Sequence, residues 1–129
     1  MEVFFGTWKL IKKVNFDDYL VAIGILHEMN NDVIKPTDTF YQDDEHLIFT
    51  TKNSHFTRDV RFKLDEPFYE DTKDGRLCHS VISLKGGQLV QVQKWDEKET
   101  TIVREIKGSN MIMTLKFDGV EGVRIYEKV

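Results

Sequence analysis

Turn signals recur along the chain after Pro36, mostly eight to eleven residues apart, and this rhythm limits the possible folds more than any other feature. Asp-Gly and Gly-Gly pairs favour tight β-hairpins, because these residues tolerate positive φ angles. Short runs between regularly spaced turns are typical of up-and-down sandwiches and barrels. The signals fall at Asp43-Asp44-Glu45, Lys52-Asn53, Leu64-Asp65-Glu66, Lys73-Asp74-Gly75, Gly86-Gly87, Asp96-Glu97, Lys107-Gly108-Ser109 and Asp118-Gly119.

The runs between these turns predict nine strands, and a run from Phe4 to Val14 predicts a tenth. We expect an all-β fold, a ten-stranded antiparallel up-and-down barrel. Closing the sheet removes exposed strand edges, and ten strands leave room for a ligand inside. The 129 residues are 40% hydrophobic and 12% aromatic, enough for one domain (residues 1–129) with its own core.

The segment from about residue 15 to residue 35 interrupts the β pattern and predicts a short helix-turn-helix lid. Phe16, Tyr19, Leu20 and Ile23 follow helical spacing. Asn15 suits the N-cap, and Asp17 and Asp18 suit the positive end of the helix dipole. Gly24 suits the C-terminal end of this helix. Leu26, Met29 and Val33 predict a second short helix that ends before Pro36.

Composition excludes several classes of partner. The net charge is -4, the pI is about 5.5, and no basic run is present, so we expect no nucleic-acid binding. No apolar stretch reaches the roughly 18 residues of a membrane span. Glu2 and the lack of a cationic N-terminal region predict no signal peptide. Cys78 is the only cysteine, which fits a reducing, cytoplasmic environment.

Several polar residues alternate with apolar ones on the predicted strands. They could face solvent, or they could line a partly polar lumen, and the pattern leaves both interpretations open. Arg124 and Tyr126 are two residues apart and share one strand face, and Arg104 shares a face with Ile102. Simple alternation would put Val123 and Ile125 inside and Arg124 in water. Pointing inward, Arg104, Arg124 and Tyr126 would offer two guanidinium groups and a hydroxyl to one carboxylate.

The remaining reactive side chains show no metal or catalytic spacing. The histidines are His27, His46, His55 and His79, and no two have the spacing of a zinc-ligand pair. Cys78 and His79 are adjacent on a strand and point to opposite faces, which argues against a thiolate pair. We therefore expect no metal, no cofactor and no enzyme activity.

Several stretches resemble the intracellular lipid-binding protein family, in its fatty-acid-binding branch. Phe4-x-Gly6-Thr7-Trp8-Lys9-Leu10 and Asn15-Phe16-Asp17-Asp18-Tyr19-Leu20 are similar to the opening strand and first helix of that family. Further similar stretches are Lys35-Pro36-Thr37, Phe62-Lys63-Leu64 with Pro67-Phe68, Asp71-x-x-Asp74-Gly75-Arg76, Gln88 to Asp96, Lys98-Glu99-Thr100-Thr101-Ile102-x-Arg104 and Arg124-Ile125-Tyr126.

The resemblance covers the whole chain and implies a fatty acid inside the barrel. Position by position, it implies that Arg104, Arg124 and Tyr126 hold the ligand carboxylate. It implies a cavity lining of Phe16, Leu20, Ile23, Asp74, Arg76, Ile102, Met113 and Leu115, and a portal at Phe56. It further implies a cytoplasmic monomer that carries long-chain fatty acids and has at most transient membrane contact.

Two departures from the family pattern concern the lid and the portal. Asn30, Asn31 and Asp32 stand where the family has a basic pair, and the second helix is about two residues shorter. The spacing around Ser54-His55-Phe56 is shifted by one, so His55 could take the portal position instead of Phe56. The alternatives are a carrier of retinoic acid or another acidic lipid, a membrane-organising protein and an enzyme acting on a bound lipid.

Overall fold

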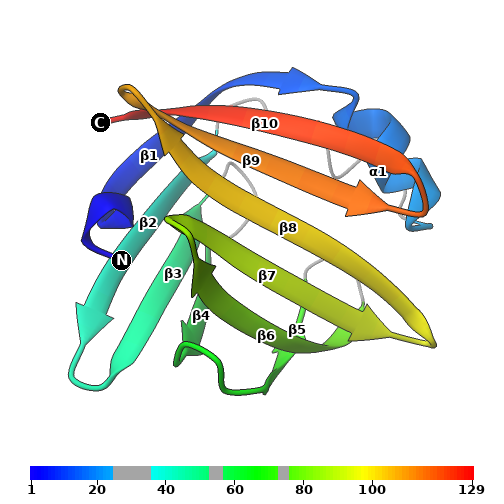
Figure 1. The fold of residues 1–129 in the computed structure, drawn as a ribbon, viewed down its shortest axis with the longest axis horizontal. Helices are drawn as coiled ribbons and strands as arrows, with labels where there is room; N and C mark the ends of the chain where they lie inside the picture. Colours follow the sequence, from blue (N-terminus) through cyan, green and yellow to red (C-terminus); the bar gives the residue numbers. More distant parts are fainter. Residues whose placement is uncertain (25–35, 53–56, 73–75) are drawn as a thin grey trace.

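Ten antiparallel strands wrap into one nearly closed barrel, with a short helix at one end (Figure 1). The computed structural model describes residues 1–24, 36–52, 57–72 and 76–129. The expected all-β fold class is confirmed. The strands are β1 (Gly6–Val14), β2 (Thr37–Asp43), β3 (His46–Lys52), β4 (Thr57–Phe62), β5 (Phe68–Asp71), β6 (Leu77–Lys85), β7 (Gln88–Trp95), β8 (Lys98–Lys107), β9 (Asn110–Phe117) and β10 (Val120–Lys128).

Tight turns join the C-terminal strands where the sequence predicts them. Strand β7 meets β8 through Asp96 and Glu97, which have φ angles of 44° and 61°. Strand β9 meets β10 through Asp118 and Gly119, at 48° and 81°. Two successive positive φ angles match the right-handed twist of the flanking strands, so these two-residue loops set the register of each hairpin.

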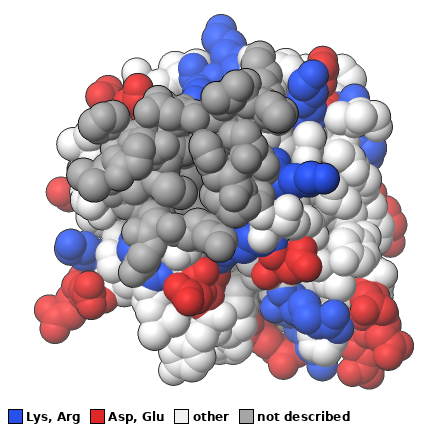
Figure 2. Space-filling view, turned by 180° about the vertical axis from the view of Figure 1, so that it is seen from behind, with Lys and Arg blue, Asp and Glu red and all other residues white. Residues whose placement is uncertain are grey.

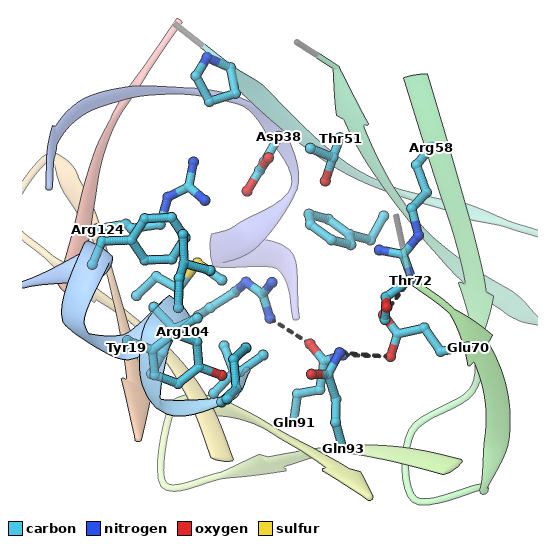
Figure 3. A pocket seen from close by; sticks show the side chains of 18 of the residues that line it. Tyr19, Asp38, Thr51, Arg58, Glu70, Thr72, Gln91, Gln93, Arg104 and Arg124 are labelled. Atoms are coloured by element: carbon cyan, nitrogen blue, oxygen red, sulfur yellow. Dashed lines mark hydrogen bonds and ion pairs between the residues drawn. The ribbon is translucent and has the colours of Figure 1, made fainter. Parts of the chain in front are cut away.

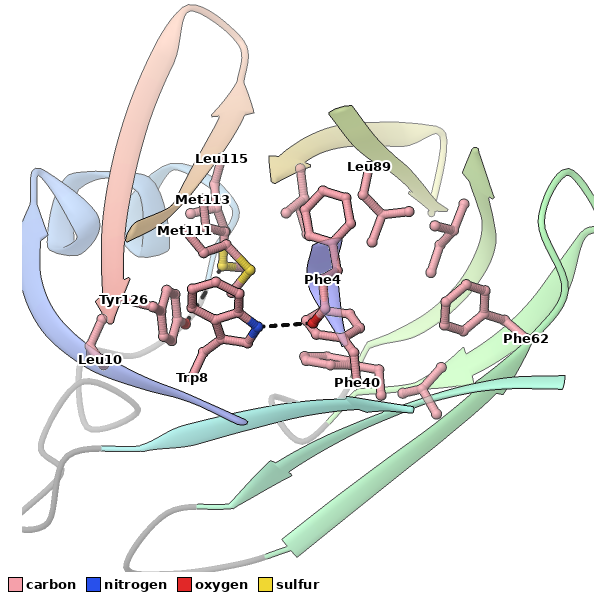
Figure 4. Close-up of a cluster of buried hydrophobic side chains, with 14 of the residues drawn as sticks. Phe4, Trp8, Leu10, Phe40, Phe62, Leu89, Met111, Met113, Leu115 and Tyr126 are labelled. Atoms are coloured by element: carbon pink, nitrogen blue, oxygen red, sulfur yellow. Dashed lines mark hydrogen bonds between the residues drawn. The ribbon is translucent and has the colours of Figure 1, made fainter. Parts of the chain in front are cut away.

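The chain starts differently from the prediction of a strand from Phe4. Residues Glu2–Phe4 form a 3-10 turn (η1), and β1 begins at Gly6. The turn is closed by the Phe4 amide, which donates to the Met1 carbonyl at 2.9 Å. The Phe4 carbonyl accepts a hydrogen bond from the Trp8 indole at 2.9 Å, and its fully buried ring fills this end of the barrel (Figure 4). Burial of that ring outweighs the strand preference of the segment.

Helix α1 (Phe16–Ala22) covers the other end of the barrel and packs against β10. Asn15 holds the N-cap position, but the predicted side-chain cap is wrong. Its φ of 55° is left-handed, and its carbonyl accepts from the Tyr19 amide at 3.2 Å. The helix lies so close to β10 that a Cβ on Gly122 would stand 3.0 Å from the Tyr19 Cβ. The predicted second helix lies in 25–35, outside the described residues.

The barrel is incomplete as a hydrogen-bonded sheet between β4 and β5. These strands stand at the two ends of the strand order β4-β3-β2-β1-β10-β9-β8-β7-β6-β5. Side chains join them instead, through an ion pair between Arg58 and Glu70 at 2.7 Å and stacked rings of Phe62 and Phe68. No helix in the described part of the chain is long and apolar enough to span a membrane.

Candidate functional site

A cavity opens inside the barrel beneath α1, and strands from both sides supply its lining (Figure 3). Cross-strand partners in an antiparallel sheet point to the same face, so the register shows which residues share the lumen. Met113 on β9 pairs with Arg104 on β8 and with Arg124 on β10, which places both arginines in one row. Asp38, Thr51 and Arg58 form a second row across β2, β3 and β4.

The two arginines of the first row are held over aromatic rings. The Arg104 guanidinium lies 4.8 Å from the Phe49 ring centre, and that of Arg124 lies 4.6 Å from the Phe16 ring centre. Such contacts are attractive, because the face of an aromatic ring is electron-rich. The Nε atoms of Arg104 and Arg124 are buried without a hydrogen-bond partner. Buried donors without partners are costly, so an acceptor placed in the cavity would relieve that cost.

Arg104 is 3% exposed, and its Nη1 donates a hydrogen bond to the Gln91 Oε1 at 3.0 Å. Burial lowers the pKa of Arg104, although the charge of Asp38 opposes that fall. An arginine stays protonated at neutral pH even so. Tyr126 is 1% exposed, and burial raises the pKa of its phenol, which therefore remains a neutral hydroxyl donor. The row thus offers cationic donors and one hydroxyl to the same space.

Glu70 on β5 organises the opposite wall of the cavity. It accepts hydrogen bonds from Arg58 at 2.7 Å and from Gln91 and Gln93 at 3.1 Å (Figure 3). It also accepts one from the Ser80 hydroxyl at 2.7 Å. Burial alone would raise the pKa of Glu70, but the hydrogen bonds and the charge of Arg58 hold it below the ordinary value. Gln91 donates to Glu70 and accepts from Arg104, so it links the Glu70 cluster to the first arginine of the opposite row.

The rest of the lining is apolar and comes largely from α1 and the C-terminal strands. Phe16 and Leu20 of α1 and Ile23 directly after it line the cavity, as do Ile102, Met113 and Leu115. The Tyr19 hydroxyl fixes the helix by donating to the Thr100 Oγ1 at 2.6 Å, because that oxygen donates its own proton to the Lys116 carbonyl. A polar network beside an apolar surface suits an amphipathic small molecule.

The structure brings Arg104, Arg124, Tyr126 and Arg76 together on this cavity with the six apolar residues predicted above. That they bind a ligand stays a prediction. Asp74 and Phe56 lie outside the described residues. Sequence reasoning missed Asp38, Arg58 and Glu70. The sequence did hold one signal for Asp38. Residues two apart on a strand point to the same face, so Asp38 shares the inward face of β2 with the buried Phe40.

A nearly closed ten-stranded barrel with a cavity inside defines a ligand-binding β-barrel protein. The family model of the lipocalin / cytosolic fatty-acid binding protein family matches residues 5–129, and the chain belongs to this family. The family resemblance inferred from the sequence is thereby confirmed.

Named relatives cover the full barrel. Fatty acid-binding protein 9 of Homo sapiens is 40% identical over 131 residues, which span 100% of this chain and 99% of the relative. The crystal structure of Echinococcus granulosus fatty-acid-binding protein 1 has a TM-score of 0.94 at 32% identity, covering 100% of this chain and 99% of the other. The fluorescent protein UnaG has a TM-score of 0.91 at 40% identity, covering 99% and 98%.

Proposed function

We propose that this protein binds a long-chain fatty acid inside its barrel and carries it through the cytoplasm. The observation that carries the proposal is the row Arg104–Met113–Arg124, in which two buried arginine Nε atoms without partners flank an apolar side chain. Tyr126 adds a neutral hydroxyl to the same cavity. Two relatives named for fatty-acid binding, from Homo sapiens and Echinococcus granulosus, support this ligand class.

The mechanism is sequestration without bond making. Moving an acyl chain from water into the apolar part of the cavity is favourable by about 25 cal/mol per Å², before ordering costs. A carboxylate costs free energy to bury unless it is paired, and the arginines with Tyr126 supply that pairing. Solubilising and releasing a lipid requires no covalent step, so we propose a carrier and not an enzyme.

The surface is consistent with a carrier that has no nucleic-acid partner. Acidic and basic side chains are interspersed over the described part of the face in Figure 2. With a net charge of -4, the chain lacks the basic excess that nucleic-acid binding requires. We propose a monomer with at most transient membrane contact.

Titration of delipidated protein with oleate and with retinoic acid tests the proposal. We expect one oleate per barrel and weaker binding of retinoic acid, measured by displacement of a fluorescent fatty acid. UnaG, described as a fluorescent protein, and the human fatty acid-binding protein 9 are both 40% identical to this chain. Sequence identity alone therefore does not determine the ligand, and the titration has to compare different lipids. Clear preference for retinoic acid, or no binding of oleate, would reject the fatty-acid assignment.

A further inference from the structure

Asp38 is a carboxylate of the protein itself inside the proposed head-group site. It is 2% exposed and lines the same cavity as Arg104, Arg124 and Tyr126. Figure 3 shows its carboxylate on the side of the lumen where the Arg124 guanidinium lies. Its row, Asp38–Thr51–Arg58, faces the cavity from β2, β3 and β4, and the arginine row faces it from β8 and β10.

The other buried carboxylate of the cavity is already engaged. Glu70 accepts hydrogen bonds from Arg58, Ser80, Gln91 and Gln93. The charges that act most on Asp38 are those of Arg124 and Arg104, and the hydroxyl groups of Tyr126 and Thr51 also stabilise its ionised form. Three of these four groups are the donors that a ligand carboxylate would need. Asp38 and a fatty acid therefore compete for one set of donors.

Competition with a ligand carboxylate should change the protonation of Asp38. Two adjacent carboxylates in a buried site repel, and a proton on one of them relieves the repulsion. Burial already raises the pKa of Asp38, although Arg124 and Arg104 oppose that rise. A bound fatty acid would raise this pKa further. A neutral lipid hydroxyl brings no charge and can donate its proton to an ionised Asp38.

We propose that Asp38 determines head-group specificity: it couples fatty-acid binding to the uptake of one proton, and it lets the cavity accept neutral hydroxyl lipids such as fatty alcohols and monoacylglycerols. This inference rests on the proposed function and refines its ligand class. It requires that the other described charged groups facing the cavity keep their charge near neutral pH. These groups are the guanidinium cations of Arg58, Arg76, Arg104 and Arg124 and the carboxylate of Glu70, which remains ionised because its pKa is lowered. Tyr126 contributes a neutral hydroxyl, because burial raises its pKa.

The test compares the delipidated wild-type protein with Asp38→Asn, an almost isosteric change that removes the charge. The ligands are oleate and oleyl alcohol, titrated from about pH 6 to about pH 9, where a group that gains a proton on binding gives up to a tenfold loss of affinity per pH unit. Calorimetry in buffers with different ionisation enthalpies counts the protons. Asp43→Asn, on the exposed end of the same strand, is the matched control.

For the wild type and for Asp43→Asn, we expect oleate affinity to fall as the pH rises, with net proton uptake, and oleyl alcohol affinity to stay flat. For Asp38→Asn, we expect oleate binding to be about tenfold or more tighter at the alkaline end, with no proton uptake beyond that of the lipid itself. The ratio of acid to alcohol affinity should rise accordingly. If Asp38→Asn fails to fold, Asp38→Thr serves as the second variant, with the same expectations.

Equal oleate affinity, pH profile and proton count in wild type and Asp38→Asn would overturn the role of Asp38 and leave the carrier function standing. Failure of every variant to bind either lipid would instead reject the proposed function, and this inference with it. The shared titration of the lipid carboxyl cancels in the comparison, so a difference between the proteins reports on Asp38 alone.

Discussion

At the scale of single residues, Arg124 shows how pairing across strands overrides local alternation. Val123 and Ile125 are its apolar neighbours, and the pattern alone would place them in the core. The structure leaves all three half-buried, with the Arg124 guanidinium over the Phe16 ring. Its pairing with Met113, which also pairs with Arg104, fixes the inward face. That constraint comes from a neighbouring strand and cannot be derived from the strand that contains Arg124.

We predict that Arg124→Gln weakens oleate binding far more than oleyl alcohol binding. Removing one partner of a buried, hydrogen-bonded charge pair costs about 2–5 kcal/mol, whereas the alcohol brings no charge to lose. Displacement of a fluorescent fatty acid measures both affinities. Arg61→Gln, a surface change on β4 beside an exposed Asp43, should leave both unchanged. Equal losses for acid and alcohol would mean that Arg124 does not meet the head group.

At the scale of elements, the hairpins and the ten-stranded barrel were predictable from the sequence, but the side chains that join β4 to β5 were not. Asp96-Glu97 and Asp118-Gly119 specify their turns through positive φ angles, which is a local property. The Arg58–Glu70 pair joins β4 to β5 from inside the lumen, and neither residue stood out in the sequence. An acid or an arginine on a strand usually faces water, so Asp38, Arg58 and Glu70 could be assigned to the cavity only once the strands were placed around it.

We predict that Arg58→Gln destabilises the protein by about 2 kcal/mol, because it leaves the buried Glu70 carboxylate without its cationic partner. Urea unfolding at neutral pH measures the loss. Glu70 has a lowered folded pKa, so its stabilisation is present above the ordinary value of 4.5 and is lost as the pH falls through the folded value. The difference between wild type and Arg58→Gln should therefore shrink in acid.

Arg61→Gln is the matched control, because Arg61 lies on the same strand as Arg58 and its ion pair with Asp43 of β2 is more than half exposed at both residues. Such surface pairs contribute about 0–1 kcal/mol. Hydrogen exchange supplies a second measurement, with faster exchange expected in β4 and β5 of Arg58→Gln only. If the difference in unfolding free energy between wild type and Arg58→Gln stayed constant from neutral to acid pH, the loss of stability would not come from the ionised Glu70.

At the scale of the whole molecule, the interior and the surface carry opposite charge. The chain has a net charge of -4, yet the described cavity lining holds four arginines against two carboxylates. The unliganded lumen therefore keeps uncompensated positive charge inside the barrel, where buried charges are screened less by salt than exposed ones. A bound anion should offset that charge, and because it binds only the folded barrel, it should also shift the folding equilibrium.

We predict that oleate raises the melting temperature of the delipidated protein by about 10 °C at a free concentration a hundredfold above its dissociation constant. Binding to the folded state alone adds about 2.7 kcal/mol under that condition. For a domain of this size, each kcal/mol shifts the midpoint by roughly 4 °C. Scanning calorimetry with methyl oleate at the same total concentration provides the control, since the ester has the same chain but neither the charge nor a hydroxyl. We expect a smaller shift with the ester, because the buried arginines gain no anionic partner.

An unchanged melting curve at saturating oleate would show that the ligand does not enter the folded barrel. Equal shifts with acid and ester would show that the acyl chain alone drives binding.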